Sequence, residues 1–247
     1  GGGRSRVIQE GEVFEKGGVN FSAVYGELPE NIVNKLELPT NGFFATGVSI
    51  VIHPLNPFVP IIHMNVRYFE MDNGGYWFGG GIDLTPHYVF PDDAEFFHRQ
   101  LKTACDRFDD SYYPRFKEWA DDYFFIRHRN ETRGIGGIFF DRLKEDADHS
   151  KTDIWEFVKE VGKTFAPTYR QLVARNKYRK FDDNNRQWQY LRRGRYVEFN
   201  LVYDKGTKFG LETDGRIESI LMSLPRQASW LYNHVPTRGS EEEKTMT

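Results

Sequence analysis

The side chains best suited to chemistry are three polar residues spaced two apart within residues 60–69. His63, Asn65 and Arg67 alternate there with apolar residues, and side chains two apart on a strand share one face. This trio therefore offers a proton donor, an amide and a guanidinium on one surface. A surface salt bridge is the simpler explanation for Arg67 taken alone.

The neighbouring stretches within residues 47–86 must supply the strands that hold this trio. By the same alternation, Ser49 and His53 share a face on the preceding strand. On the following strand, Asp83 shares a face with the outer two glycines of the triplet at 79–81. Because glycine has no side chain, a flat ligand could lie close to the backbone beside Asp83. A turn cap explains Asp83 equally well.

Familiar catalytic motifs are missing from the sequence. No GxxxxGK[ST] loop, strand-GxGxxG-helix unit, HExxH, CxxC or GxSxG occurs, which argues against the sites that these motifs form. No histidine opens an HxD or HxE pair, which counts against a common facial-triad iron site. Four histidines could still hold a metal ion, although their spacing is irregular and each alone is more often structural: His53, His63, His98 and His128.

Arginines gather at 192–195 (RRGR) and recur at Arg133 and Arg216. A solvated basic patch is one explanation. The other is a pocket for several carboxylates, which guanidinium groups bind in a bidentate manner. Arg216 follows an Asp214-Gly215 turn, whose backbone N–H groups could help to hold an anion.

Composition sets the protein class. The 247 residues are 39% hydrophobic, enough for a sizeable core, and we expect one domain, 1–247, with a disordered tail from about 237. The net charge of −3 gives no support for nucleic-acid binding, and no apolar run approaches the length of a membrane span. The single cysteine excludes an internal disulfide framework. We expect a cytoplasmic protein, and the start at Gly1 leaves room for a removed targeting segment.

The order of the expected elements favours an α+β fold. Apolar spacing predicts a helix that begins near 91–93 with an aspartate N-cap, a second around Pro114, and a third from a Ser150–Asp153 capping box to about 177, interrupted near Pro167. Residues 182–195 are expected to form a helix followed by a loop, and residues 1–6 a frayed end. Three alternating runs predict an antiparallel meander at 196–204, 207–213 and 217–224.

Long segments of the chain closely resemble the oxygen-dependent coproporphyrinogen III oxidases, oxidoreductases of haem and porphyrin biosynthesis. The matching segments run from residue 1 to about 225 and include GGGRSRV, GVNFSAVYGE, GVSIVIHPLNPFVPIIHMNVRYF, WFGGGIDLTP, YYPRFKEWADDYFFIRHRNETRGIGGIFFD and LRRGRYVEFNLVYDKGTKFGLETDGRIESILMSLP. The resemblance implies a large, flat antiparallel sheet of about seven strands, flanked by helices on both faces. It also implies a homodimer formed through about 196–231.

The implied reaction is oxidative decarboxylation of the ring A and B propionates of coproporphyrinogen III to vinyl groups, giving protoporphyrinogen IX. Dioxygen is the co-substrate, no organic cofactor is needed, and the resemblance leaves a divalent metal open. His63 matches the proton donor and Asp83 the acceptor for pyrrole N–H groups. The same four histidines match positions sometimes assigned as metal ligands. Substrate contacts match Ser49, Asn65, Val66, Arg67, Asp214, Gly215 and Arg216.

Two other hypotheses stay open on the residues alone. One is a non-enzymatic haem or tetrapyrrole-binding protein with a histidine as axial ligand, and the other is a histidine-ligated metal oxygenase.

Overall fold

The computed structural model describes residues 1–212 and 215–246, except for the side chains at 35 and 36. Its main feature is a six-stranded antiparallel sheet in the order β1-β2-β3-β4-β5-β8. These strands are β1 (Gly2–Gln9), β2 (Phe14–Glu27), β3 (Gly42–Pro54), β4 (Ile61–Met71), β5 (Tyr76–Thr85) and β8 (Gly137–Leu143). A second, two-stranded sheet pairs β6 (Phe125–Ile126) with β7 (Glu131–Thr132).

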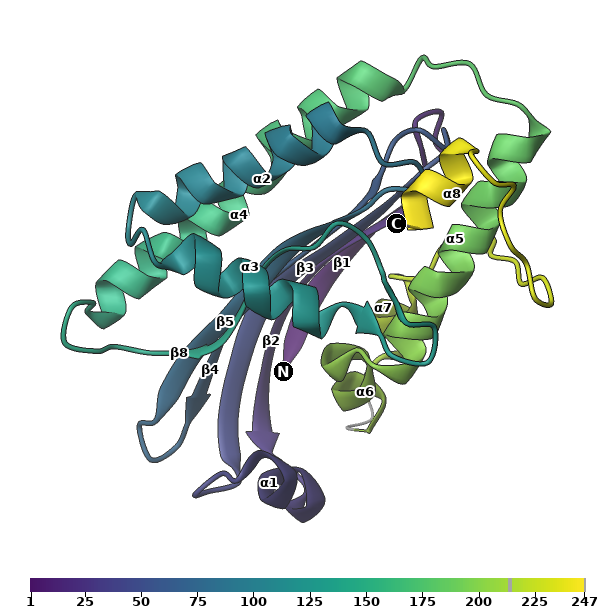
Figure 1. Ribbon diagram of the computed structural model, residues 1–247. Coiled ribbons are helices and arrows are strands. Elements are labelled where there is room, and N and C mark those ends of the chain that lie inside the picture. Colours follow the sequence, from purple (N-terminus) through teal and green to yellow (C-terminus); the bar gives the residue numbers. More distant parts are fainter. Residues whose placement is uncertain (213–214, 247) are drawn as a thin grey trace.

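Helices cover both faces of the sheet, with α2, α3 and α4 on one side and α5, α6 and α7 on the other (Figure 1). The prediction of an α+β fold is confirmed, with six strands in the main sheet rather than about seven. The helices are α1 (Glu30–Leu36), α2 (Pro91–Asp106), α3 (Tyr112–Tyr123), α4 (Lys151–Asn176), α5 (Asp183–Val202), α6 (Lys205–Glu212), α7 (Ile217–Leu221) and α8 (Glu241–Met246).

The main core lies between the sheet and helices α2, α3 and α4. On β4, Ile62 and Met64 point into it, together with Ile82 of β5 and Phe157 of α4. Full burial of such a side chain stabilises the fold by roughly 1.5–3 kcal/mol. The apolar half of the alternating pattern is therefore used for stability, and the polar half faces the other way. We call this second surface, which carries His63, Asn65 and Arg67, the polar face.

The C-terminal helices close over part of the polar face. Tyr196 of α5 packs on Val51 and Ile61. At the end of α7, Met222 lies so close to Gly18 that a Cβ on this glycine would meet its sulfur at 2.8 Å. The bare backbone of β2 therefore lets the end of α7 approach the sheet.

The predicted C-terminal meander is wrong. Residues 183–202 form one continuous helix, which Asp182 caps by accepting a hydrogen bond from Asn185 N at 3.0 Å. Leu191, Tyr196 and Phe199 lie buried at helical spacing, a period that the shorter alternating runs concealed. The Lys205-Gly206 pair lies at the start of α6, where Asp204 accepts a hydrogen bond from Thr207 N at 2.7 Å. Asp214 lies outside the described residues.

The predictions at both ends of the chain are also wrong. Residues 2–9 are not frayed, because β1 pairs with β2 along its whole length. The tail expected to be disordered contains α8, whose Glu242 accepts a hydrogen bond from the Tyr88 hydroxyl at 2.6 Å.

Three helix predictions are confirmed in position, with corrected details. The capping box of Ser150 and Asp153 is present at the start of α4. Pro167 lies inside α4 without ending it, although it lacks the N–H that a helix uses. The N-cap of α2 is Phe90 without a side-chain cap, and Pro91 takes the first helical position, where its missing N–H costs nothing.

Within the described ranges, no helix is both long and apolar enough to cross a membrane.

Buried histidines predict how stability depends on pH. His53 is fully buried against Tyr196 and donates to the Ser223 carbonyl at 2.7 Å, and burial lowers its pKa to about 3. Below the ordinary pKa of 6.5, the unfolded chain binds a proton at this residue and the folded chain does not, so acid favours unfolding. Between pH 7.5 and pH 5, His53→Gln should lose about 2 kcal/mol less unfolding free energy than the wild type, measured with urea. Parallel pH profiles for the two proteins would contradict this.

Candidate functional site

A row of polar residues crosses the polar face from the edge of the sheet towards β5. The register pairs Ser5 with Asn20, Asn20 with Ser49, and Ser49 with Asn65. Ser5 donates to Asn20 Oδ1 at 2.8 Å, and the row continues to Gly81 of β5. All four polar side chains are only partly buried. The middle of this face is therefore a partly exposed surface with hydrogen-bonding groups and not a core. We call these four residues the polar floor.

His63 and Asp83 stand opposite each other at one side of this floor. The register pairs them directly, and His63 Nδ1 donates to Asp83 Oδ1 at 2.7 Å. The side chain of His63 is 23% exposed and that of Asp83 only 3%. The bond fixes the ring and leaves its other nitrogen, Nε2, as the edge of the imidazole that can meet a ligand.

Arg133 holds the second oxygen of Asp83. Its side chain is 2% exposed and donates to Asp83 Oδ2, and it also donates to Asn200 Oδ1 of α5 at 3.2 Å. Three aromatic rings surround its guanidinium at 4.3–4.8 Å: Phe124, Tyr196 and Phe199. Burial alone would raise the pKa of Asp83, but the Arg133 charge and the His63 hydrogen bond hold it below its usual value. Asp83 is therefore ionised and fully engaged.

Asp83 is engaged within the protein in this structure. Both of its oxygens are bonded within the protein and its side chain is buried. It therefore lies beneath the polar face, behind His63, rather than open to the pyrrole N–H groups of a ligand.

Arg67 lies on β4, four residues after His63, and covers Gly79 of β5. A Cβ on Gly79 would meet the guanidinium of Arg67 at 2.6–2.8 Å. Arg67 donates from Nη1 to Asn65 Oδ1 at 3.0 Å and lies 2.9 Å from Asp141 of β8 through Nη2. The space above this glycine is thus filled by an arginine. At Gly81 a Cβ would meet the carbonyl of Ile138 at 2.4 Å, so this glycine is what lets β8 approach β5 closely.

The remaining predicted substrate contacts are scattered. Val66 packs against the main core on the opposite face, so only its backbone borders Asn65 and Arg67. Gly215 and Arg216 lie just before α7, where Ser219 meets Ser5 at 3.1 Å between the hydroxyl oxygens. Arg216 therefore lies on the β1 side of the polar face, because α7 follows it directly. Its side chain is 77% exposed.

The four histidines proposed as metal ligands do not come together. His53 is buried under α5, while His98 of α2 bonds the Ile135 carbonyl at 3.0 Å and the Tyr113 hydroxyl at 3.1 Å. His128 pairs with Glu198 at 2.6 Å. In the part of the chain that the structure describes, no group of three or more His, Cys, Asp or Glu side chains could hold a metal ion.

The RRGR arginines form neither a solvated patch nor a carboxylate pocket. Arg192 and Arg195 both pair with Glu131, at 3.0 Å and 2.7 Å. Arg193 is fully buried and pairs with Glu15 at 2.5 Å. These residues fasten α5 to the sheet and to β7.

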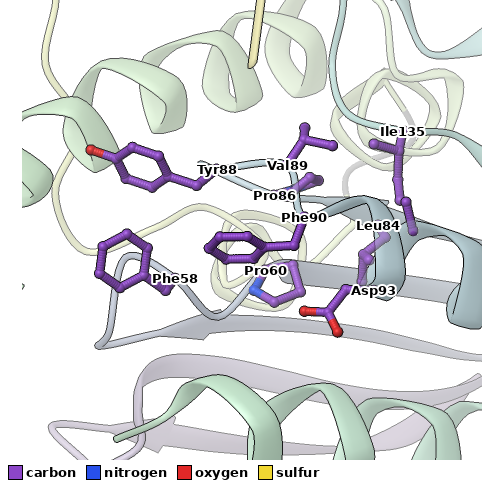
Figure 2. Close-up of a pocket in the computed structure, with 10 residues that line it drawn as sticks. Phe58, Pro60, Leu84, Pro86, Tyr88, Val89, Phe90, Asp93 and Ile135 are labelled. Carbon is purple, nitrogen blue, oxygen red and sulfur yellow. The ribbon is translucent and has the colours of Figure 1, made fainter. Parts of the chain in front are cut away.

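Figure 2 shows a pocket apart from the polar face. Its lining is almost wholly apolar and includes Phe58, Pro60, Phe90 and Ile135, and it has room for roughly one water molecule. No residue of the polar floor lines it, so it offers no link to His63.

Sequence reasoning missed two residues of this surface, Asn20 and Asp141, and named Arg133 without its buried partner. Asn20 could have been found by extending the alternation to β2, but its partner Ser49 is 29 positions away in sequence. Asp141 needed the register of β8, and Arg133 precedes a glycine-rich loop with no pattern of its own.

The whole chain is similar to proteins of one known family. Residues 1–247 match the family model described as coproporphyrinogen III oxidase. The chain is 54% identical over 259 residues to the oxygen-dependent coproporphyrinogen-III oxidase of Drosophila melanogaster, covering 100% of this chain and 66% of that protein. It is 51% identical over 261 residues to the chloroplastic oxygen-dependent coproporphyrinogen-III oxidase of Glycine max, covering 100% and 67%. The chain thus spans about two thirds of the length of these curated relatives.

The buried pair predicts a specific stability pattern. Asp83→Ala leaves the Arg133 charge unpaired inside the protein and should lower the unfolding free energy by about 3–5 kcal/mol. Adding Arg133→Met removes that charge and should restore part of the loss, as measured by urea unfolding. If Arg133→Met instead lowers stability as much in the Asp83→Ala protein as in the wild type, the two residues are not coupled.

Proposed function

Because the chain belongs to the coproporphyrinogen III oxidase family, we propose that it converts the ring A and B propionates of coproporphyrinogen III to vinyl groups, with O₂ as oxidant. The observation that carries the proposal is the polar face, where a fixed histidine and a partly exposed arginine stand on the same strand. An acid group for proton transfer and a cation for carboxylates are what a propionate substrate requires.

The chemistry balances without an organic cofactor. Each propionic acid side chain loses CO₂ from its carboxyl and one hydrogen from the carbon next to the macrocycle, and a carbon–carbon double bond forms. The two electrons and two protons released pass to O₂, which becomes H₂O₂. The reduced macrocycle is itself electron-rich, so the protein needs only to bind it, orient it and move protons.

His63 is proposed as the proton donor. Its Nδ1 is held by Asp83, so Nε2 is the nitrogen that faces a substrate. The hydrogen bond to Asp83 holds the ring so that Nε2 is the atom that can pass a proton to the substrate. Asp83 is a positioning residue in this scheme, since it acts through the ring and not by touching substrate.

Arg67 is proposed to bind a substrate carboxylate, with Asn65 and Ser49 as neighbouring hydrogen-bonding groups on the same floor. Arg216 and the Gly215 backbone would hold another carboxylate from the opposite side, since α7 starts beside them above β1. Asp214 completes this segment in the family pattern and lies outside the described residues.

We also propose a homodimer formed through about 196–231. The described part of this region is helical, so a dimer would form through helix faces and not by strand pairing. Its support is a set of apolar side chains that are at least 44% exposed: Leu201, Val202, Leu211, Ile217, Trp230 and Leu231. A cytoplasmic location stays a prediction, and the plant relatives are named chloroplastic.

The direct test is product formation in air and under nitrogen. Coproporphyrinogen III incubated with the protein in air should give protoporphyrinogen IX with one H₂O₂ for each vinyl group, and no product should form under nitrogen. Binding of haem with a histidine-ligated absorption band and no turnover would instead support a tetrapyrrole-binding protein.

His63→Gln tests the proposed proton donor. It keeps a neutral side chain of similar size but cannot act as an acid, so kcat should fall at least about 100-fold with KM within about threefold. His234→Gln is the matched control, because His234 is exposed and lies outside the polar face. A kcat for His63→Gln close to that of the control would rule out the assigned role.

A further inference from the structure

Asp141 of β8 lies beside Arg67 at the edge of the polar face. Its Oδ1 is 2.9 Å from Arg67 Nη2, and the two side chains are 27% and 35% exposed. Neither group is therefore locked in the core, unlike Arg133 and Asp83, whose side chains are 2% and 3% exposed. An ion pair at this depth contributes little stability, so structure alone does not account for it.

The contact between these two charges is close but poorly aligned. Asp141 Oδ1 is buried and has no hydrogen-bond partner among the described residues, although Nη2 lies within reach. By contrast, Arg67 Nη1 makes a well-directed bond to Asn65. The guanidinium thus keeps N–H groups that a better-placed carboxylate could bind in a bidentate manner.

Asp141 lies at a β-bulge in β8. Between the pairs Gly80–Phe140 and Phe78–Leu143, β8 has two residues, Asp141 and Arg142, where β5 has only Gly79. Arg142 adopts a φ of +50°, which is unfavourable for a residue other than glycine. Asp141 is thus both a bulge residue and the acid directly beside the glycine on which Arg67 rests, and bulges are frequent next to functional sites.

We infer that Asp141 is a built-in competitor for the carboxylate that Arg67 binds. In the free protein it neutralises Arg67 and holds the guanidinium flat over Gly79. When a propionate arrives, the carboxylate takes the N–H groups and Asp141 moves aside into water. This inference rests on the proposed function, since it deepens the role of Arg67 in binding substrate.

Such competition suits a reaction that treats two propionates in turn. A carboxylate held too tightly by Arg67 would keep one ring in place and delay the second. A neighbouring acid that is always present lowers the affinity for each carboxylate and speeds its release. Arg67 would therefore select acids without trapping them.

The test measures binding separately from turnover. Coproporphyrin III, the stable oxidised and fluorescent tetracarboxylate, serves as the probe, and its Kd is read from fluorescence. Asp141→Asn should tighten binding about fivefold and lower the KM for coproporphyrinogen III by a similar factor. Asp141→Ser, checked for folding by circular dichroism, is the second variant.

Two controls decide the interpretation. Glu70→Gln removes one negative charge from β4, the strand that carries Arg67, but on the opposite face of the sheet. Glu70 accepts there from the Tyr68 hydroxyl at 2.5 Å, and its replacement should leave Kd unchanged. In an Arg67→Met protein, Asp141→Asn should no longer change Kd. An unchanged Kd in Asp141→Asn, or equal tightening in the Glu70→Gln or Arg67→Met proteins, would overturn the inference. If the wild type shows no turnover of coproporphyrinogen III, the proposed function is wrong. The Kd values would still test whether Asp141 competes for Arg67.

Discussion

The polar face depends on one buried ion pair, in which the charge of Arg133 must be balanced by the carboxylate of Asp83. Arg133 has lost its water, and only Asp83, Asn200 and a cage of aromatic rings replace it. Removing charges from water is expensive, and the pair is stable only when its geometry is kept. That requirement fixes Asp83, and through it the ring of His63. The buried Arg133–Asp83 pair thus sets the orientation of His63 on the polar face.

Several parts of the chain must meet before this arrangement exists. The histidine and aspartate come from adjacent strands, the arginine from the loop before β8, and the amide and two of the rings from α5. Because α5 also joins its arginines to Glu131 and Glu15, it cannot shift without breaking several ion pairs. The half of the sheet nearest His63 is therefore held rigidly, while the floor towards Asn65 and Ser49 stays partly exposed. Rigid acid–base groups beside an accessible binding floor fit a large substrate that needs proton transfer at one place.

Prediction from the sequence succeeded best in strands, where the two-residue alternation of polar and apolar side chains shows which residues share a face. Alternation in β3, β4 and β5 placed His63, Asn65 and Arg67 on one face, and the register confirms it. The C-terminal helices were missed because alternating runs and glycine turns over short spans imitate strands, and only packing on the sheet distinguishes the two. Charge pairs between distant segments, such as Arg133 with Asp83 or Arg193 with Glu15, leave no local trace. The glycine triplet was seen, but its use as a seat for Arg67 depends on a neighbouring strand.

The extra residue in β8 bears on both binding and packing. Up to Phe140 the strand alternates regularly, and past the bulge Leu143 returns to the main core opposite Phe78. If the same residues paired without the bulge, residue 143 would turn to the polar face and lose its core contact, because side chains on a regular strand swap faces at every step. One irregular step thus lets a single edge strand present an acid to the polar face and return an apolar side chain to the interior two residues later.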